Sequence, residues 1–472
     1  MALDKYDLII IGGGAAGFAA ATRAAELGAR GLIINSGLPL GGTCVNVGCV
    51  PTKLLLEIGS EYYYAQHFRF QAAEPAKCEH AGPADFVSAI SEKDRMVVAL
   101  RDSNYTQVAQ ALGTPLLEGK ATFASANQVA VNGQTLEADK FIIATGSRPQ
   151  IVPIKGLEKV RYITSREALS LSHLPKSMVV VGGGAVAVEF AQMYARFGTR
   201  VTILQRGKQL LSHSEPEVAT ELQRCLEAEG IKIHTGVTVN RVWEEGEAKA
   251  VEARIGTHQF MVIAEQLLIA TGVMPNSDSL GLAAAGVEVD ARGFVKVDGQ
   301  LRTSAPHIWA AGDVVGKALL ETVAAKEGYT AAGNALTGSA STIDYDSIPH
   351  AVFTDPQVAS VGLTDAEFMR RHKVCSCRTV EIARVPKAKV IKETRGLIKM
   401  VIDPRTRVIV GVHMVAPGAA DLIHEATLAV KFKLTIDDVI DTVHVFPTMS
   451  EGIKLVAQSF KRDISQMSCC VE

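Results

Sequence analysis

The stretch DLIIIGGGAAG, residues 7–17, decides the fold of the N-terminal part of the chain. A short β-branched run enters a glycine turn and continues into an alanine-rich segment reaching about Glu26, which predicts a strand, a tight turn and a helix. In the pattern Gly12-x-Gly14-x-x-Gly17, the first glycine permits the turn and the second lets backbone N–H groups approach a pyrophosphate. The third lets the helix pack closely on the strand. The stretch therefore predicts a dinucleotide site.

A second copy of this pattern follows at residues 178–187, MVVVGGGAVA, with Gly182, Gly184 and Ala187 at the matching positions. Each copy is followed by a similar strand and turn, FIIATG at 141–146 and LLIATG at 267–272. Near-continuous apolar strands joined by helices predict parallel sheets buried on both faces. We therefore expect an α/β fold with two Rossmann-like dinucleotide-binding domains.

Composition narrows the class of protein. The chain has 472 residues, of which 47% are hydrophobic, and 41 are glycines, as in compact multidomain α/β enzymes. A formal charge of -2 gives no electrostatic attraction to nucleic acid or to an anionic membrane surface, so we expect neither partner. The apolar run near the N-terminus is too short for a bilayer span and lacks signal-peptide features. Eight cysteines in such a chain favour a reducing cytoplasm, where any disulfide is catalytic or transient.

The second copy also carries information on its cofactor. Its next strand, residues 200–204, leads into Gln205-Arg206-Gly207-Lys208. An NAD site would place an acidic residue near Gln205 to bind the ribose hydroxyls, and there is none. Arg206 and Lys208 are suited instead to a 2′-phosphate, so we expect NADPH in preference to NADH. The alternative is an ordinary solvated basic turn.

The strongest signal is GGTCVNVGCVPTK, residues 41–53, which contains Cys44 and Cys49. Two buried structural cysteines would be the alternative, but the glycine, asparagine and proline frame disfavours it. The segment resembles the redox-disulfide segment of the glutathione reductase and lipoamide dehydrogenase superfamily, the pyridine nucleotide–disulfide oxidoreductases. In that superfamily the cysteines lie at a helix start against FAD, and we expect the helix N-terminus to favour the thiolate.

The resemblance implies specific roles. Cys49 would touch the flavin, Cys44 would exchange with substrate, and Lys53 would lie by the flavin N5 and pair with Glu189. A further flavin motif, IWAAGD at 308–313, would place Asp313 on the ribityl hydroxyls. The expected cofactor-binding residues, for FAD and NADPH together, are Gly12, Gly14, Gly17, Asn35, Gly42, Thr43, Lys53, Thr145, Gly146, Gly182, Gly184, Ala187, Arg206, Lys208, Gly272, Gly312 and Asp313. Asn35 departs from the family, which usually places a glutamate on the adenosine ribose at this point.

The resemblance and the change in character near Asp344 predict four domains. We expect an FAD-binding domain at 1–150 and an NAD(P)H-binding domain at 151–275. A central domain at 276–343 would complete the FAD site. Residues 344–472 would form an α+β dimerisation domain, with strands near 396–402 and 408–412 and a helix at 419–431, giving a glutathione reductase-like architecture.

Disulfide reductases of this superfamily carry a C-terminal His-Pro-Thr-x-Ser-Glu segment. The histidine protonates the leaving dithiol and the glutamate orients it. Here residues 446–451 read FPTMSE, so Glu451 remains and Phe446 replaces the base. This argues against glutathione, lipoamide or thioredoxin-type disulfides as substrates. His444, two residues upstream, is the alternative base.

The chain ends with two adjacent cysteines, Cys469 and Cys470. Adjacent thiols form disulfides with each other poorly, but they can chelate a soft metal ion with near-linear coordination. An accident of composition is the alternative. Together with Phe446 and Glu451, the tail resembles that of the mercuric reductases, in which the paired cysteines of one subunit pass Hg(II) to the redox pair of the other.

Two features depart from the mercuric reductase pattern. These enzymes often have a tyrosine where Phe446 stands, so a phenol contact to mercury is in question there. They also often carry an N-terminal metal-trafficking module with a Cys-x-x-Cys, and this sequence begins at the flavin strand. Delivery of mercury would then depend on the C-terminal tail or on small thiols.

The sequence as a whole predicts a cytoplasmic homodimer in which NADPH reduces Hg(II) to Hg(0) through FAD and Cys44–Cys49, with active sites shared between subunits. The metal ligands would be Cys44, Cys49, Cys469 and Cys470. A large thioredoxin reductase or a lipoamide dehydrogenase-like enzyme is the alternative within the class. A thiol-rich metal-buffering protein would leave two dinucleotide sites unexplained. The pattern Cys375-x-Cys377 indicates either a pair of metal ligands or an ordinary strand segment.

Overall fold

The glycine turn predicted at residues 12–17 is present in the computed structural model, which describes residues 5–70, 72 and 84–467. It joins β1 (Lys5–Ile11) to α1 (Ala15–Glu26). Gly12 has φ +123°, and a Cβ there would overlap the carbonyl oxygen of Ala144. A Cβ on Gly17 would overlap the carbonyl oxygen of Gly12. Both positions therefore require glycine, because the backbones approach too closely for a side chain.

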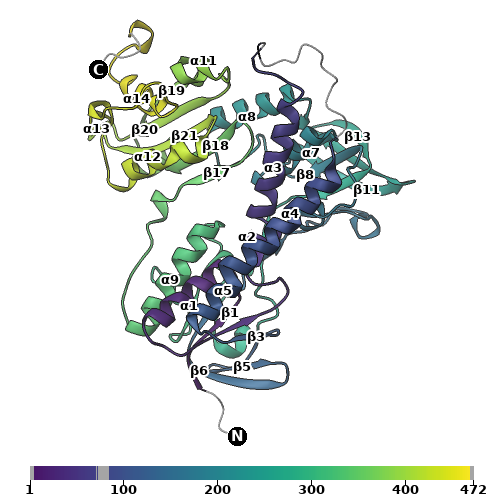
Figure 1. The fold of residues 1–472 in the computed structure, drawn as a ribbon, viewed down its shortest axis with the longest axis vertical. Coiled ribbons are helices and arrows are strands. Elements are labelled where there is room, and N and C mark those ends of the chain that lie inside the picture. The colour runs from purple at the N-terminus through teal and green to yellow at the C-terminus, as the bar shows by residue number, and fades with distance from the viewer. Residues whose placement is uncertain (1–4, 71, 73–83, 468–472) are drawn as a thin grey trace. The chain divides into compact units, whose positions relative to one another are not determined.

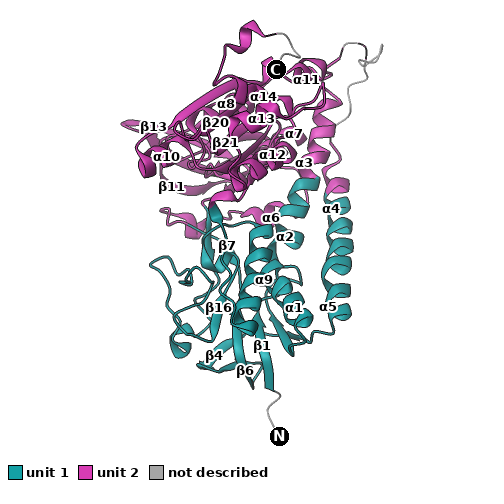
Figure 2. Cartoon of the chain, turned by 90° about the vertical axis from the view of Figure 1, so that its left-hand side faces the viewer, with its two compact units in different colours: residues 1–54, 90–151, 272–345 teal, residues 55–89, 152–271, 346–472 magenta. Residues whose placement is uncertain are grey.

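The chain divides into two compact units (Figure 2). The first comprises residues 1–54, 90–151 and 272–345, and the second comprises residues 55–89, 152–271 and 346–472. The first unit thus combines most of the predicted FAD-binding and central domains, and the second combines the predicted NAD(P)H-binding and dimerisation domains. The finer division into four domains stays a prediction.

A sheet of seven strands forms the centre of the first unit, in the order β3-β2-β1-β6-β5-β4, with β16 also pairing with β6. The strands β3, β2, β1, β6 and β16 run parallel, whereas β5 and β4 are antiparallel. Their bounds are β2 (Gly31–Asn35), β3 (Leu116–Glu118), β4 (Thr122–Ser125), β5 (Gln128–Val131), β6 (Gln134–Ile143) and β16 (Ile308–Ala310). The apolar strand residues Ile9, Ile10 and Ile142 are fully buried, as expected for a sheet covered on both faces.

Helices surround this sheet and carry the redox segment. Helix α1 packs along α9 (Glu321–Thr337) (Figure 1). The others are α2 (Gly42–Val47), the first residues of α3 (Cys49–Tyr64), most of α4 (Phe86–Arg101), a π-helical turn at Asp102–Thr106 and α5 (Gln107–Leu112). A small antiparallel pair, β7 (Ser147–Pro149) and β15 (Val273–Pro275), completes the unit.

The second unit repeats the dinucleotide-binding architecture. Its parallel sheet has the order β10-β9-β8-β14, with β8 (Ser177–Val181), β9 (Arg200–Leu204), β10 (Lys232–His234) and β14 (Gln266–Ile269). Gly182, φ +131°, joins β8 to α7 (Ala185–Phe197), and a Cβ there would overlap the carbonyl oxygen of Ala270. Around this sheet lie α6 (Ser165–Ala168), α8 (Pro216–Ala228) and an antiparallel sheet of β11 (Val237–Glu245), β12 (Ala248–Ile255) and β13 (His258–Ala264). The predicted internal repeat is confirmed.

The same unit contains the predicted C-terminal α+β domain. Its antiparallel sheet has the order β17-β18-β21-β20-β19. The strands are β17 (His350–Val352), β18 (Gln357–Gly362), β19 (Ser376–Glu381), β20 (Leu397–Ile402) and β21 (Ile409–Ala416), and the helices are α10 (Asp365–His372), α11 (Pro386–Val390), α12 (Ala419–Lys431), α13 (Ile436–Asp441) and α14 (Glu451–Gln458). The two strands and the helix predicted here are confirmed. No helix in the described part of the chain is long and apolar enough to cross a membrane.

A buried lysine ties α8 to this sheet. The side chain of Lys399, in the middle of β20, is 1% exposed, and its ammonium lies 2.9 Å from Glu215, 2.9 Å from Glu217 and 3.0 Å from Asp365. Burial alone lowers the pKa of Lys399, but hydrogen bonds to the three carboxylates outweigh it and leave the pKa raised. The side chain of Glu215 is also 1% exposed. The group is stable because each buried charge has an opposite charge beside it.

Replacing Lys399 by methionine should destabilise this domain by about 3 kcal/mol, because Glu215 would then be buried without a cation. Hydrogen exchange of the β20 amides measures that loss as a local free energy of opening. The matched control is Lys389→Met, which removes an exposed lysine of α11. The double variant Lys399→Met/Glu215→Gln should recover part of the loss. Equal exchange rates in the two single variants would contradict this account.

Candidate functional site

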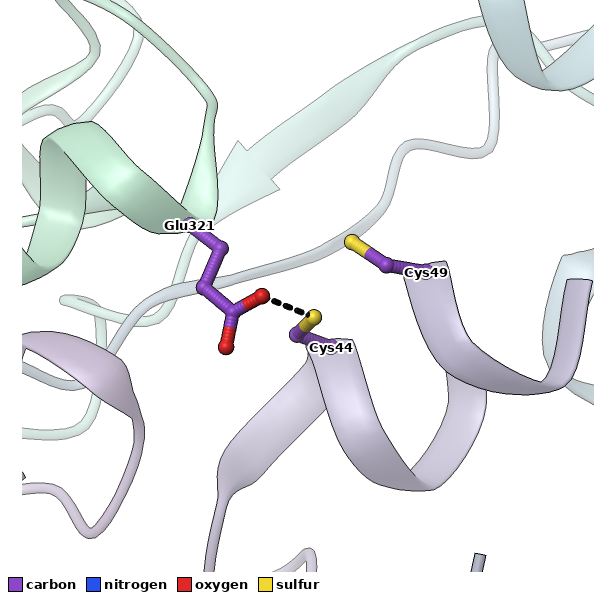
Figure 3. A group of neighbouring side chains, drawn as sticks. All are labelled: Cys44, Cys49 and Glu321. Carbon is purple, nitrogen blue, oxygen red and sulfur yellow. Dashed lines mark hydrogen bonds between the residues drawn. The ribbon is translucent and has the colours of Figure 1, made fainter. Parts of the chain in front are cut away.

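The two cysteines of the redox segment lie on two consecutive helices, α2 and α3, rather than on one helix. Cys44 is within α2, Gly48 interrupts the helix, and Cys49 is the first residue of α3. A Cβ on Gly48 would lie 2.8 Å from the carbonyl oxygen of Thr43, so this break favours glycine. The break leaves both side chains on the same side, as Figure 3 shows. Cys44 is half-buried and Cys49 is exposed.

Two residues that the sequence analysis missed complete this group. The thiol of Cys44 donates to the Oε2 atom of Glu321, the first residue of α9 (Figure 3). The hydroxyl of Tyr105 donates to the Oε1 atom of the same carboxylate at 3.1 Å. The Sγ atoms of Cys44 and Cys49 and a carboxylate oxygen of Glu321 all lie within 4.8 Å of one another. Glu321 follows the Asp313 motif in the sequence, but its approach to Cys44 depends on the packing of α9 along α1.

Electrostatics at Cys44 differ from the expectation. The hydrogen bond with Cys49, burial and the neighbouring Glu321 carboxylate raise the pKa of the Cys44 thiol. Burial, followed by the Glu321 charge, raises the pKa of Tyr105. The pKa of Cys44 is therefore shifted in the direction opposite to the one expected from the helix start, chiefly by the hydrogen bond with Cys49 and by burial, with the Glu321 carboxylate adding to them.

The glycine turn of β1–α1 holds the redox segment directly. The N–H of Gly41 donates to the carbonyl oxygen of Gly13 at 2.7 Å. A Cβ on Gly42, φ +61°, would lie 3.0 Å from the Cα of Gly14. Asn35 is 6% exposed. Its Oδ1 accepts from the N–H of Gly13 at 3.2 Å and its Nδ2 donates to Leu38 at 3.0 Å. Asn35 thus braces the turn with its amide, which leaves one lone pair of Oδ1 for a ribose hydroxyl.

The second flavin motif lies against the same helix. The N–H of Gly312 donates to Glu327 at 2.6 Å, and a Cβ on Gly312 would lie 3.2 Å from the Cβ of Ala16. The hydroxyl of Ser147 donates to Asp313 at 2.6 Å, and burial raises the pKa of Asp313. A backbone N–H turn at a helix start and a carboxylate beside that helix are groups that fit a dinucleotide such as FAD. Two more of the expected cofactor residues follow β6. The hydroxyl of Thr145 donates to the carbonyl oxygen of Asn276 at 2.8 Å, and Gly146 has φ +67°.

The nucleotide turn of the second unit also fits its predicted ligand. Gly184 precedes the first residue of α7, and Ala187 is fully buried. The side chain of Gln205 bonds to the carbonyl oxygen of Gln209 at 3.0 Å. Arg206 and Lys208 are exposed and form no ion pair with any residue that the structure describes. These cations are therefore accessible to a phosphate group. Gly272, φ +104°, belongs to the first unit.

Lys53 and Glu189 belong to different units, so their pairing stays a prediction. The carboxylate of Glu189 is 4% exposed and accepts from the N–H of Phe353 at 2.8 Å. The roles assigned to Lys53 and Thr43 at the flavin are likewise predictions.

In the described part of the C-terminal segment, the candidate replacement for the missing base is held by hydrogen bonds. His444, the alternative base, has a side chain that is 7% exposed. Its Nδ1 lies 3.0 Å from the carbonyl oxygen of Thr442 and its Nε2 lies 2.8 Å from Glu425. Both ring nitrogens are therefore engaged within the domain. Glu451 accepts from the N–H of Thr448 at 3.2 Å, and Phe446 is 49% exposed.

The other cysteines contribute less. Cys377 lies in β19, with its Sγ 3.7 Å from Asp365, and burial raises the pKa values of Cys375 and Cys377. Among the described residues, Cys44, Cys49 and Glu321 form the one group with metal-ligand spacing, which favours the strand interpretation for Cys375-x-Cys377. Cys469 and Cys470 lie outside the described residues.

Comparison with known proteins agrees with this site. Residues 6–335 match the family described as pyridine nucleotide-disulphide oxidoreductase, and residues 348–457 match the dimerisation domain of these enzymes. The mercuric reductase of Streptomyces lividans is 41% identical over 98% of this chain and 98% of its own. The mercuric reductase of Lysinibacillus sphaericus is 39% identical over 99% of this chain and 85% of its own.

Among solved structures, the HOCl-induced flavoprotein disulfide reductase RclA from Escherichia coli, as its Cu(II) complex, has a TM-score of 0.86. It is 28% identical and covers 97% of this chain and 100% of its own. The matched dimerisation domain supports a homodimer. The sequence matches span nearly the whole chain, and the structural match has the same fold; the chain belongs to the pyridine nucleotide-disulphide oxidoreductases and, within them, to the mercuric reductase family.

Proposed function

We propose that this protein reduces Hg(II) to Hg(0) with the two electrons of NADPH, and that Cys44 and Cys49 hold the ion during reduction. The observation that carries the residue assignment is the convergence of the two thiols and one carboxylate within 4.8 Å of one another. FAD, when bound, would accept a hydride from NADPH and pass electrons to the cysteine pair. The balance is NADPH and Hg(II) giving NADP⁺, a proton and Hg(0).

The chemistry of mercury fits two adjacent thiols. Hg(II) is a soft cation that prefers thiolate ligands. Binding requires that both thiol protons leave, because thiolate rather than thiol is the ligand. Glu321 already accepts the Cys44 proton in a hydrogen bond, so it is placed to receive that proton as the metal binds.

Delivery of Hg(II) would involve the partner subunit. We infer that Cys469 and Cys470 of one chain capture the ion from small thiols and transfer it to the Cys44–Cys49 pair of the other chain. Exposed apolar side chains of the C-terminal domain supply surface for the dimer contact: Leu428, Phe432, Val443, Val445 and Phe446. Large exposed apolar side chains gathered in one domain indicate a protein interface. A reducing cytoplasm, in which these thiols stay reduced, is the compartment that suits them.

The substrate class is tested by anaerobic NADPH oxidation. With Hg(II) in excess small thiol, oxidation should be sustained and should release volatile Hg(0). With oxidised thioredoxin, glutathione disulfide or lipoamide, the rate should be close to background, since the base at Phe446 is missing and His444 is engaged. Sustained turnover with a disulfide and none with Hg(II) would overturn the proposal.

The tail is tested by replacing Cys469 and Cys470 together with alanine. Turnover of Hg(II) presented by weakly competing ligands should fall, because the capture site is lost. Reduction of FAD by NADPH, followed by its loss of absorbance in stopped flow, should stay unchanged. Cys375→Ala/Cys377→Ala is the control for removing two thiols elsewhere. Impaired FAD reduction in the tail variant would count against the capture role.

The nucleotide preference is tested with Arg206→Gln/Lys208→Gln. The KM for NADPH should rise at least about tenfold, as expected when charge-assisted hydrogen bonds to a phosphate are lost. The KM for NADH, which lacks the 2′-phosphate, should change little. Arg254→Gln, which removes an exposed arginine of β12, is the charge control. Equal changes for both nucleotides would show that these residues do not read the 2′-phosphate.

A further inference from the structure

The carboxylate at the redox pair is positioned as a metal donor. Glu321 Oε2 accepts the Cys44 thiol hydrogen, so one proton lies between a sulfur and an oxygen atom. Cys49 Sγ is within 4.8 Å of both ligand atoms. The three side chains point toward one another from α2, the start of α3 and the start of α9 (Figure 3). A cation bound there would replace the shared proton and contact all three side chains.

Tyr105 fixes the orientation of this carboxylate. Its hydroxyl donates to Oε1 at 3.1 Å, which leaves Oε2 directed at the cysteines. The Tyr105 side chain is itself held, because its ring packs edge-on against Phe18 with the centroids 5.0 Å apart. A ligand whose second oxygen is anchored by a neighbouring donor is pre-oriented for a metal.

The donor set differs from the one that mercury needs. Hg(II) is satisfied by two thiolates, whereas two sulfurs and one carboxylate oxygen are donors of the type that Zn(II) uses. Three protein ligands with a fourth position left to water is a common zinc arrangement. Zn(II) has no redox chemistry, so an enzyme that binds it here could not release it by reduction.

We propose that Cys44, Cys49 and Glu321 of the reduced enzyme form a site for a borderline divalent cation of the Zn(II) class, in which Glu321 is the third ligand and Tyr105 its positioning residue. The bound cation occupies the place of Hg(II) and inhibits its reduction. The site depends on the proposed function only in that NADPH converts the cysteine pair to the dithiol. Binding releases the thiol protons to solvent.

The test measures uptake of Zn(II) alone by FAD-loaded protein, with free Zn(II) set by a chelating buffer. The background is Cys469→Ala/Cys470→Ala, which removes the tail thiols. One Zn(II) per chain should bind after anaerobic reduction with NADPH, and this ion should be missing before reduction. Glu321→Gln should weaken it at least about tenfold, since even loss of an outer partner of a metal ligand costs that much. Tyr105→Phe should give a smaller loss.

Glu92→Gln, an exposed carboxylate of α4 in the same unit, is the matched charge control and should bind Zn(II) like the parent. The flavin absorbance spectrum and the thermal unfolding midpoint of Glu321→Gln should match those of the parent, which shows that the variant is folded. Equal Zn(II) affinity in Glu321→Gln and Glu92→Gln, or equal uptake before and after reduction, would overturn the site. These results do not depend on Hg(II) turnover. If the protein took up Zn(II) normally but did not reduce Hg(II), the proposed function alone would be overturned.

Discussion

The close backbone approach at the first glycine turn is the constraint on which the rest of the first unit depends. Gly17 lies against the carbonyl oxygen of Gly12, and Gly12 lies against the carbonyl oxygen of Ala144, so a Cβ at either position would overlap a carbonyl oxygen. The same turn receives the redox segment, because the N–H of Gly41 bonds to Gly13 and Gly42 lies against Gly14. The same turn therefore presents the N-terminus of α1, which is suited to a pyrophosphate, and holds the segment that carries the two cysteines. The glycine turn and the redox segment are thus coupled by a backbone hydrogen bond and a close backbone approach.

This coupling explains why so much of the architecture was predictable. Glycines that exclude side chains and strands that are buried on both faces leave local signals, and both copies of the strand–turn–helix unit formed where the sequence placed them. The strands at 397–402 and 409–416 and the helix at 419–431 carried equally local patterns. Local patterns did not reveal the interruption at Gly48, which puts Cys44 and Cys49 on separate helices.

The residues that were missed act over long sequence separations. Glu321 reaches Cys44 across 277 positions and Tyr105 across 216 positions. Neither belongs to a motif, and their meeting depends on how α9 packs along α1. Glu327, which holds the N–H of Gly312, was missed for the same reason. Asn35 shows the opposite case: its departure from the family pattern was visible, but its use as a brace for Gly13 required the fold.

The raised pKa of the Cys44 thiol bears on whether the substrate is a disulfide or a metal ion. Thiol–disulfide exchange proceeds by attack of a thiolate, so a Cys44 whose pKa is raised by Cys49, burial and Glu321 is a poor partner for a substrate disulfide. An absent base at Phe446 and an engaged His444 act in the same direction. A metal ion does not need a pre-formed thiolate, because its affinity for sulfur displaces the proton on binding. The Cys44 proton is shared with Glu321 in a hydrogen bond, and an ion that binds sulfur strongly enough would displace it. The same geometry that disfavours disulfide exchange is compatible with capture of a thiophilic cation.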